Sequence, residues 1–158
     1  MPTAPLVVAD PPRKSGLRVL IAEAELSSRV ALLGLLSKYG DCSVAVNGRD
    51  AVEAFRSARQ SGHGYDLICL DIQMPDMNGQ EAVYAIRSIE ENERLYWSGR
   101  VKIFMTTGIL SVMNVSLMAS FKVLCNARLI KPVDSAKLDE HLRSCGLVGM
   151  ESDKLQVL

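Results

Sequence analysis

Short apolar runs alternate with helix-like segments along most of the chain. Between the helix-like segments, the runs have the length and continuity of buried strands, and they fall at 18–22, 42–46, 67–70, 101–105 and 127–130. Apolar residues spaced three or four apart predict helices at 26–38, 51–58, 79–91, 110–124 and 134–145. Five buried strands that alternate with five helices predict an α/β fold, a doubly wound parallel sheet with helices on both faces.

Both ends of the chain lie outside this pattern. Residues 1–16 hold four of the six prolines and show no sustained period, so we expect a flexible N-terminal tail. Residues 147–158 predict a short C-terminal tail. One domain, 17–146, remains between them, and it is long enough to bury a core of its own.

Composition excludes several classes of function. Lysine plus arginine equals aspartate plus glutamate at 18 each, and this zero net charge disfavours nucleic-acid binding. The four cysteines are dispersed and form no CxxC pair, which favours reduced thiols over a metal-thiolate site. Neither a membrane-length apolar segment nor a secretory signal is present, so we expect a cytoplasmic protein without membrane attachment.

Polar residues end four of the five predicted strands. Asp71 follows the apolar run 67–70 directly, and Glu23, Thr107 and Lys131 end the first, fourth and fifth strands. If the strand order reverses next to the first strand, these four residues meet in one crevice at the carboxyl edge of the sheet. A carboxylate there can attack phosphorus, with Mg²⁺ held by Glu23 and Asp71 and with Lys131 and the Thr107 hydroxyl facing the phosphoryl oxygens.

Two other readings of this site are open. Asp71 could simply organise the turn that follows its strand. Alternatively, the architecture could carry a small enzyme or a flavin. The chain has no GxGxxG motif and no glycine-rich loop after the first strand, and this absence disfavours the flavin carrier.

Four motifs together resemble the receiver domain of two-component response regulators. They are Val19–Glu23, Asp66–Pro75 with Asn78-Gly79, Phe104–Gly108 and Leu129–Pro132, all in family order and at family spacing. The similarity covers about 17–146 and is closest in kind to stand-alone, chemotaxis-type regulators. It implies a flavodoxin-like sheet with strand order 2-1-3-4-5.

The resemblance also assigns roles by position. It makes Asp71 the phosphoacceptor for a histidine kinase or phosphotransfer protein, with Mg²⁺ bound by Glu23, Asp71 and the backbone carbonyl of Gln73. Thr107 becomes the switch hydroxyl and Lys131 the phosphate-sensing cation. Such a domain is not an enzyme with a separate substrate, although it assists its own phosphorylation and hydrolysis. The Lys131-Pro132 bond is a candidate cis peptide.

Two positions depart from the family pattern. Ala24 stands where a second acid is usual, which predicts weaker Mg²⁺ binding unless Glu25 compensates. Arg128 stands where an aromatic residue usually swings inward, and a guanidinium does not readily bury there. The alternative function is therefore a pseudo-receiver, an interaction or dimerisation module that signals without phosphate.

The predicted helix 110–124 has two apolar faces. Its second stripe contains Val112, Val115, Ala119 and Val123. We interpret this stripe, together with the fifth strand, as an interface for a downstream protein partner or a homodimer. The alternative is that the apolar tail piece Leu6–Val8 folds over it.

Three further interpretations concern charged or aromatic residues. The polar run Glu90–Arg94 is read as a solvated helix end. His63 and His141 lack metal-ligand spacing and are read as surface histidines. Trp97 is read as a local packing anchor.

Overall fold

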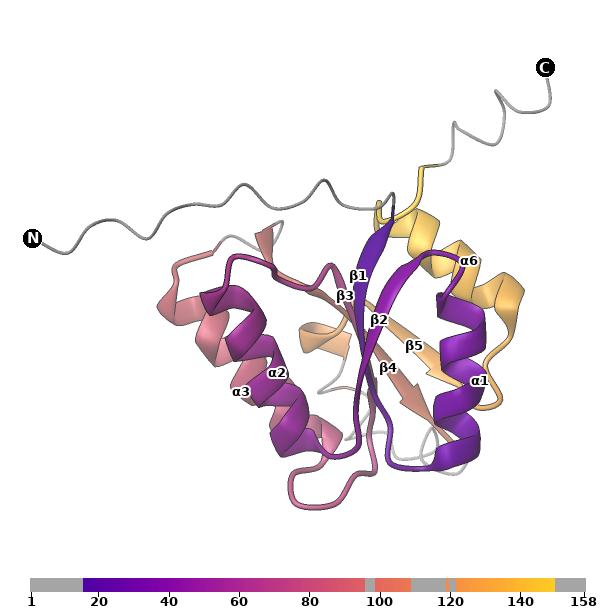
Figure 1. The fold of residues 1–158 in the computed structure, drawn as a ribbon, viewed down its shortest axis with the longest axis horizontal. Coiled ribbons are helices and arrows are strands. Elements are labelled where there is room, and N and C mark those ends of the chain that lie inside the picture. The colour runs from indigo at the N-terminus through magenta and orange to yellow at the C-terminus, as the bar shows by residue number, and fades with distance from the viewer. Residues whose placement is uncertain (1–15, 96–98, 109–118, 120–121, 150–158) are drawn as a thin grey trace, which may run out of the picture.

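A computed structural model describes residues 16–95, 99–108, 119 and 122–149 (Figure 1). The strands are β1 (Leu17–Ala22), β2 (Gly40–Ala45), β3 (Leu67–Asp71), β4 (Lys102–Thr107) and β5 (Ala127–Ile130). The helices are α1 (Leu26–Leu36), α2 (Gly48–Gln60), α3 (Gly79–Asn92) and α6 (Ser135–Ser144). These elements confirm the predicted succession apart from the helix predicted at 110–124. The predicted helix 110–124 lies mostly outside the described residues, of which Ala119 and 122–124 are helical.

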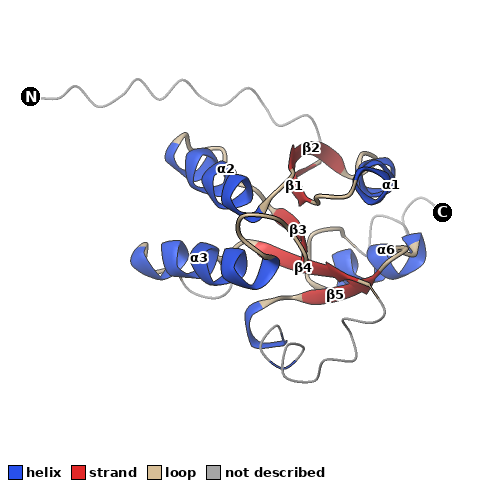
Figure 2. Ribbon diagram, turned by 90° about the horizontal axis from the view of Figure 1, so that it is seen from below, coloured by secondary structure: helices blue, strands red, loops and turns tan. Residues whose placement is uncertain are grey.

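All five strands pair in parallel in the order β2-β1-β3-β4-β5, which confirms the predicted doubly wound sheet. Helices α2 and α3 cover one face, while α1 and α6 cover the other (Figure 2). The order reverses at β1, so the carboxyl ends of β1 and β3 open onto the crevice expected at such a switch point. No helix among the described residues is long and apolar enough to span a bilayer.

The central strand β3 is buried at every position, which explains its uninterrupted apolar sequence. Its last residue, Asp71, is 5% exposed at the carboxyl edge. Asn78 begins α3 in a capping box with Glu81, so the chain turns from the strand into the helix within a short loop. This tight connection brings the first turn of α3 against the end of β3.

Gly79 is required at that contact. A Cβ at this position would lie 2.2 Å from the backbone oxygen of Asp71 and 2.8 Å from Cα of Ile72. Because these are backbone atoms, Gly79→Ala is expected to lower the free energy of unfolding by roughly 1–3 kcal/mol. Urea unfolding measures this, and Gly34→Ala is the control.

At Gly34 an added Cβ meets no atom of the described part of the chain within 4 Å, so the control substitution in α1 is expected to stabilise the protein by about 0.5–1 kcal/mol. If Gly79→Ala and Gly34→Ala changed the free energy of unfolding equally, the close packing of Gly79 against the end of β3 would not be what requires glycine there.

The structure corrects two expectations and extends the domain. Glu90 is fully buried rather than solvated, and Arg87 pairs with it. His141 is half-buried, with its ring edge-on to Phe104 at 6.0 Å between centroids. Leu147 and Val148 pack against the core beyond the predicted boundary at 146. Trp97 lies outside the described residues.

Candidate functional site

Three of the predicted site residues meet at the carboxyl edge of the sheet. The Lys131 ammonium, just past β5, lies 2.5 Å from Oε1 of Glu23 and 3.0 Å from Oδ2 of Asp71. Glu23 follows β1 and Asp71 ends β3, so the parallel topology brings together groups that lie far apart in sequence. The predicted convergence is confirmed for these three residues. The sequence pattern does not predict the ion pair between Lys131 and Glu23, because it assigns Lys131 to binding a phosphoryl oxygen.

Glu23 has the least exposed side chain of the three residues. Its side chain is fully buried, and burial is the largest cause that raises the pKa of Glu23 to about 7. A hydrogen bond with Asp71 raises this pKa further, while Lys131 opposes the shift. The second carboxylate oxygen, Oε2, is buried without a hydrogen-bond partner among the described residues. A buried carboxylate oxygen of this kind is suited to a bound cation.

Lys131 remains a cation at this position. Burial alone lowers the pKa of its ammonium, but the hydrogen bonds to Glu23 and Asp71 outweigh burial and raise the pKa above its ordinary value. The Lys131-Pro132 peptide is cis, as predicted.

Thr107 ends β4 and is almost fully buried. Its hydroxyl donates to the carbonyl oxygen of Gly108 at 3.1 Å, a local bond within the β4 end. A Cβ added to Gly108 would meet no atom of the described residues within 4 Å. The structure therefore places Thr107 at the expected strand end, with its hydroxyl bonded locally.

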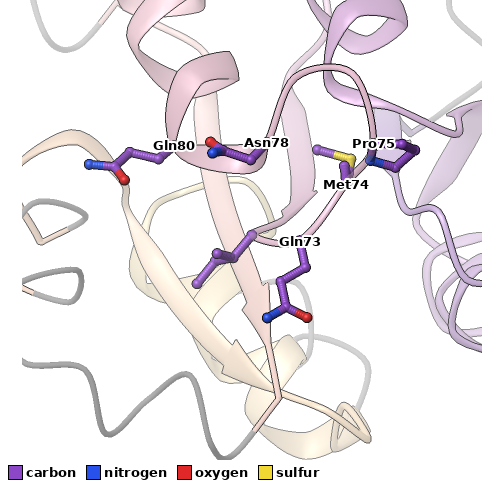
Figure 3. A pocket seen from close by; sticks show the side chains of 6 residues that line it. Gln73, Met74, Pro75, Asn78 and Gln80 are labelled. Atoms are coloured by element: carbon purple, nitrogen blue, oxygen red, sulfur yellow. The ribbon is translucent and has the colours of Figure 1, made fainter.

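Gln73 lies on the loop between β3 and α3 with an exposed side chain. Its backbone N–H donates to Oδ1 of Asp71 at 3.1 Å, which fixes the orientation of the carboxylate. A hollow of about 490 Å³ opens along this loop, and Figure 3 shows Met74 and Pro75 on the loop with Asn78 and Gln80 at the start of α3. The loop thus has a role in orienting Asp71 through its backbone.

Glu25 does not point into the crevice. Its carboxylate accepts hydrogen bonds from the backbone N–H groups of Ser27 and Ser28, at 3.1 Å and 2.8 Å, and so caps α1. Hydrogen bonds from Ser27 and then Ser28 lower the pKa of Glu25 to about 2. Beside it, Ala24 packs against the core.

Within the described ranges, no group of three or more His, Cys, Asp or Glu side chains gathers to hold a metal. A cation in the crevice would therefore rely on the two carboxylates of Glu23 and Asp71, with backbone and water oxygens completing its shell.

The second departure from the family pattern, Arg128, is exposed on β5. Exposure agrees with the expectation that its guanidinium does not bury. Of the second stripe predicted on helix 110–124, Val112 and Val115 lie outside the described residues, while Ala119 and Val123 are exposed.

The fold and the site define a class: flavodoxin-like α/β proteins with an acidic pocket and a lysine at the switch point of the sheet. The chain belongs to the response regulator receiver domain family, which matches residues 19–143.

Curated relatives agree with this membership. Hybrid signal transduction histidine kinase I of Dictyostelium discoideum is 36% identical over 91 residues, which cover 57% of this chain and 5% of that protein. Chemotaxis protein CheY of Thermotoga maritima is 34% identical over 82 residues, 51% of this chain and 64% of CheY. The matched segment thus spans less than two thirds of each of these relatives.

Solved structures agree as well. One is the receiver domain of the Saccharomyces cerevisiae response regulator Ssk1, co-crystallised with the histidine phosphotransfer protein Ypd1. It aligns with a TM-score of 0.67 and 26% identity over 86% of this chain and 94% of that one. A second is the receiver domain of a Pseudomonas aeruginosa sensor histidine kinase, with magnesium in its active-site cleft. It aligns with a TM-score of 0.65 and 23% identity over 82% of this chain and 96% of that one, and this similarity shows the shared fold.

Proposed function

We propose that Asp71 accepts a phosphoryl group from a phosphohistidine of a histidine kinase or a phosphotransfer protein. The observation that carries this proposal is the convergence of Asp71, Lys131 and the buried carboxylate of Glu23. One Asp71 oxygen attacks phosphorus, the P–N bond to the donor imidazole breaks, and an acyl phosphate P–O bond forms. The yeast receiver bound to a phosphotransfer protein supports this class of partner.

The chain's own groups hold the reacting atoms in place. The Gln73 N–H fixes Oδ1 of Asp71, and the Lys131 ammonium fixes Oδ2. In the acyl phosphate, Lys131 is close enough to turn from the carboxylates to a phosphoryl oxygen. Among the described residues, the Thr107 hydroxyl has a local bond to the Gly108 carbonyl oxygen to give up for the same purpose. Lys131 and Thr107 thus sense phosphate through a change of hydrogen-bond partner.

Mg²⁺ fits the crevice, since the buried Oε2 of Glu23 has no other partner among the described residues. Glu23, Asp71 and the backbone carbonyl of Gln73 would hold it, and it would neutralise charge on the transferring phosphoryl oxygens.

The proposed output is protein contact through the face formed by helix 110–124 and β5, with either a downstream partner or a second copy. On this face Val123 is 74% exposed and Ile130 is 42% exposed. Exposed aliphatic side chains on an edge strand and the adjoining helix end support an interface.

Phosphorylation is tested by incubation with acetyl phosphate, with and without Mg²⁺, followed by intact mass. The expected result is a Mg²⁺-dependent gain of one phosphoryl group that Asp71→Asn abolishes, because the amide is not a nucleophile for phosphorus. Asp76→Asn is the matched control, since Asp76 is exposed on the same loop, and it should leave the gain intact.

Phosphate that persists on Asp71→Asn would overturn the assignment. No gain for the unmodified chain, even with a phosphorylated histidine phosphotransfer protein as donor, would support the pseudo-receiver instead. The retained Asp71, Lys131 and Thr107 disfavour that alternative.

A further inference from the structure

Four exposed aliphatic residues form a surface that the crevice does not use. Leu26 and Val30 lie on α1 and are 64% and 58% exposed, while Val44 in β2 and Val46 just after it are 41% and 44% exposed. We refer to these four residues as the α1/β2 patch. Exposed aliphatic side chains are unremarkable singly but informative when they gather.

Strand β2 turns Val44 toward the face of the sheet that α1 covers. Cys42 packs against the core cluster on that face, and side chains alternate along a strand, so Val44 points the same way, and Val46 follows the strand directly. On α1, Leu26 and Val30 are one turn apart and therefore share one outer side. Strand β2 is outermost in the sheet and lies next to α1 (Figure 2).

Beside the patch, β2 offers an open edge. Its only neighbour among the described strands is β1. The carbonyls of Tyr39 and Ala45 accept hydrogen bonds from the β1 side. Because alternate residues turn their backbone groups to opposite sides, Cys42 and Val44 present theirs to the open edge. An open aliphatic edge promotes aggregation unless something covers it.

The N-terminal segment ends at this edge. Gly16 lies so close to the start of β2 that a Cβ there would be 2.7 Å from the Tyr39 carbonyl oxygen and 2.9 Å from Cα of Gly40. Residues 1–15 contain one run of large aliphatic residues, Leu6–Val8. The eight residues from Val8 to Gly16 can span up to about 26 Å, which exceeds the roughly 20 Å length of a six-residue strand.

We propose that Leu6–Val8 docks on the α1/β2 patch of its own chain as a short extended segment that runs antiparallel to β2. Flanking prolines at positions 5, 11 and 12 suit an edge strand, where a missing N–H is tolerated. The docked segment buries aliphatic surface on both sides and closes the open edge. This inference is independent of phosphorylation at Asp71.

The experiment places the photo-crosslinking residue p-benzoylphenylalanine at Val7 in the 158-residue chain, at a dilution that disfavours association. After irradiation, peptide mass spectrometry maps the sites of attachment. We expect intramolecular crosslinks to the peptides that contain Val30 or Val44. A reciprocal probe at Val30 should crosslink to Leu6–Val8.

Substitutions in the patch sharpen this test. Val30→Lys should reduce the Val7 crosslink yield roughly tenfold, the effect of removing one buried aliphatic contact. Val123→Lys, a change of the same kind at an exposed valine outside the patch, should leave the yield unchanged.

Crosslinks to residues 110–124, which would place the segment over the fourth helix, would overturn the proposal. Crosslinks between two chains would overturn it in favour of a second copy as occupant. An unchanged yield in Val30→Lys, or no crosslink from either probe position, would also overturn it.

Discussion

The substitution Glu90→Ala is expected to lower the free energy of unfolding by about 3–5 kcal/mol, because it leaves a buried guanidinium without its carboxylate. The Arg87 guanidinium lies 2.6 Å from Oε1 of Glu90, and both side chains are almost fully buried. The other Glu90 oxygen accepts the backbone N–H of Val101 at 2.6 Å. Removal of Glu90 therefore takes the carboxylate acceptor away from one Arg87 N–H and from the Val101 N–H.

The loss of stability should affect elements beyond α3. Arg87 also donates to the carbonyl of Leu124 at 3.0 Å and to that of Val101 at 2.9 Å, so it ties α3 to the start of β4 and to the approach to β5. Urea unfolding measures the effect. Glu90→Gln, which retains an acceptor for Val101 but not the charge, should have an intermediate effect.

Glu91→Ala is the matched control, since Glu91 is exposed on the same helix, and it should change stability by no more than about 0.5 kcal/mol. A loss below about 1 kcal/mol for Glu90→Ala would show that the buried pair does not hold these elements together.

The second large effect is expected at the proposed metal site, where Ala24→Asp should tighten Mg²⁺ binding roughly tenfold or more. Two carboxylates, Glu23 and Asp71, face the crevice, and Glu25 is occupied in capping α1. A third carboxylate at position 24 would add both an oxygen ligand and negative charge close to the cation.

Isothermal titration calorimetry of the unphosphorylated protein measures this affinity directly. Ala136→Asp adds the same charge on an exposed position of α6 and should leave the affinity unchanged. If Ala24→Asp binds Mg²⁺ no more tightly than the parent chain, another group already supplies the missing ligand and our account of position 24 is wrong.

Much of the fold can be predicted from the sequence, because a strand that is buried on both faces of the sheet requires a continuous run of apolar residues. Strand β3 illustrates this: it is buried at every position, and its sequence has one polar residue, Asp71, at the end. Topology then made the site predictable, because strand ends in a parallel sheet share one edge. Glu23, Asp71 and Lys131 were found in this way.

Other features depend on tertiary contacts that a local pattern does not contain. Glu90 belongs to the polar run Glu90–Arg94, and its burial results from the approach of the β4 start and from its partner Arg87. The spacing of three between opposite charges was the available signal. The orientation of Glu25 was likewise open, because a helix that begins at residue 26 does not settle whether the preceding carboxylate caps the helix or faces the crevice.

The central claim is that Asp71 is the residue that carries phosphate, and chemical mapping of the acyl phosphate tests it most directly. After incubation with acetyl phosphate and Mg²⁺, borohydride reduces an aspartyl phosphate to homoserine, which peptide mass spectrometry locates. Our account predicts homoserine at position 71 alone, in a Mg²⁺-dependent yield. Homoserine at another position, or phosphate that resists borohydride, would contradict it.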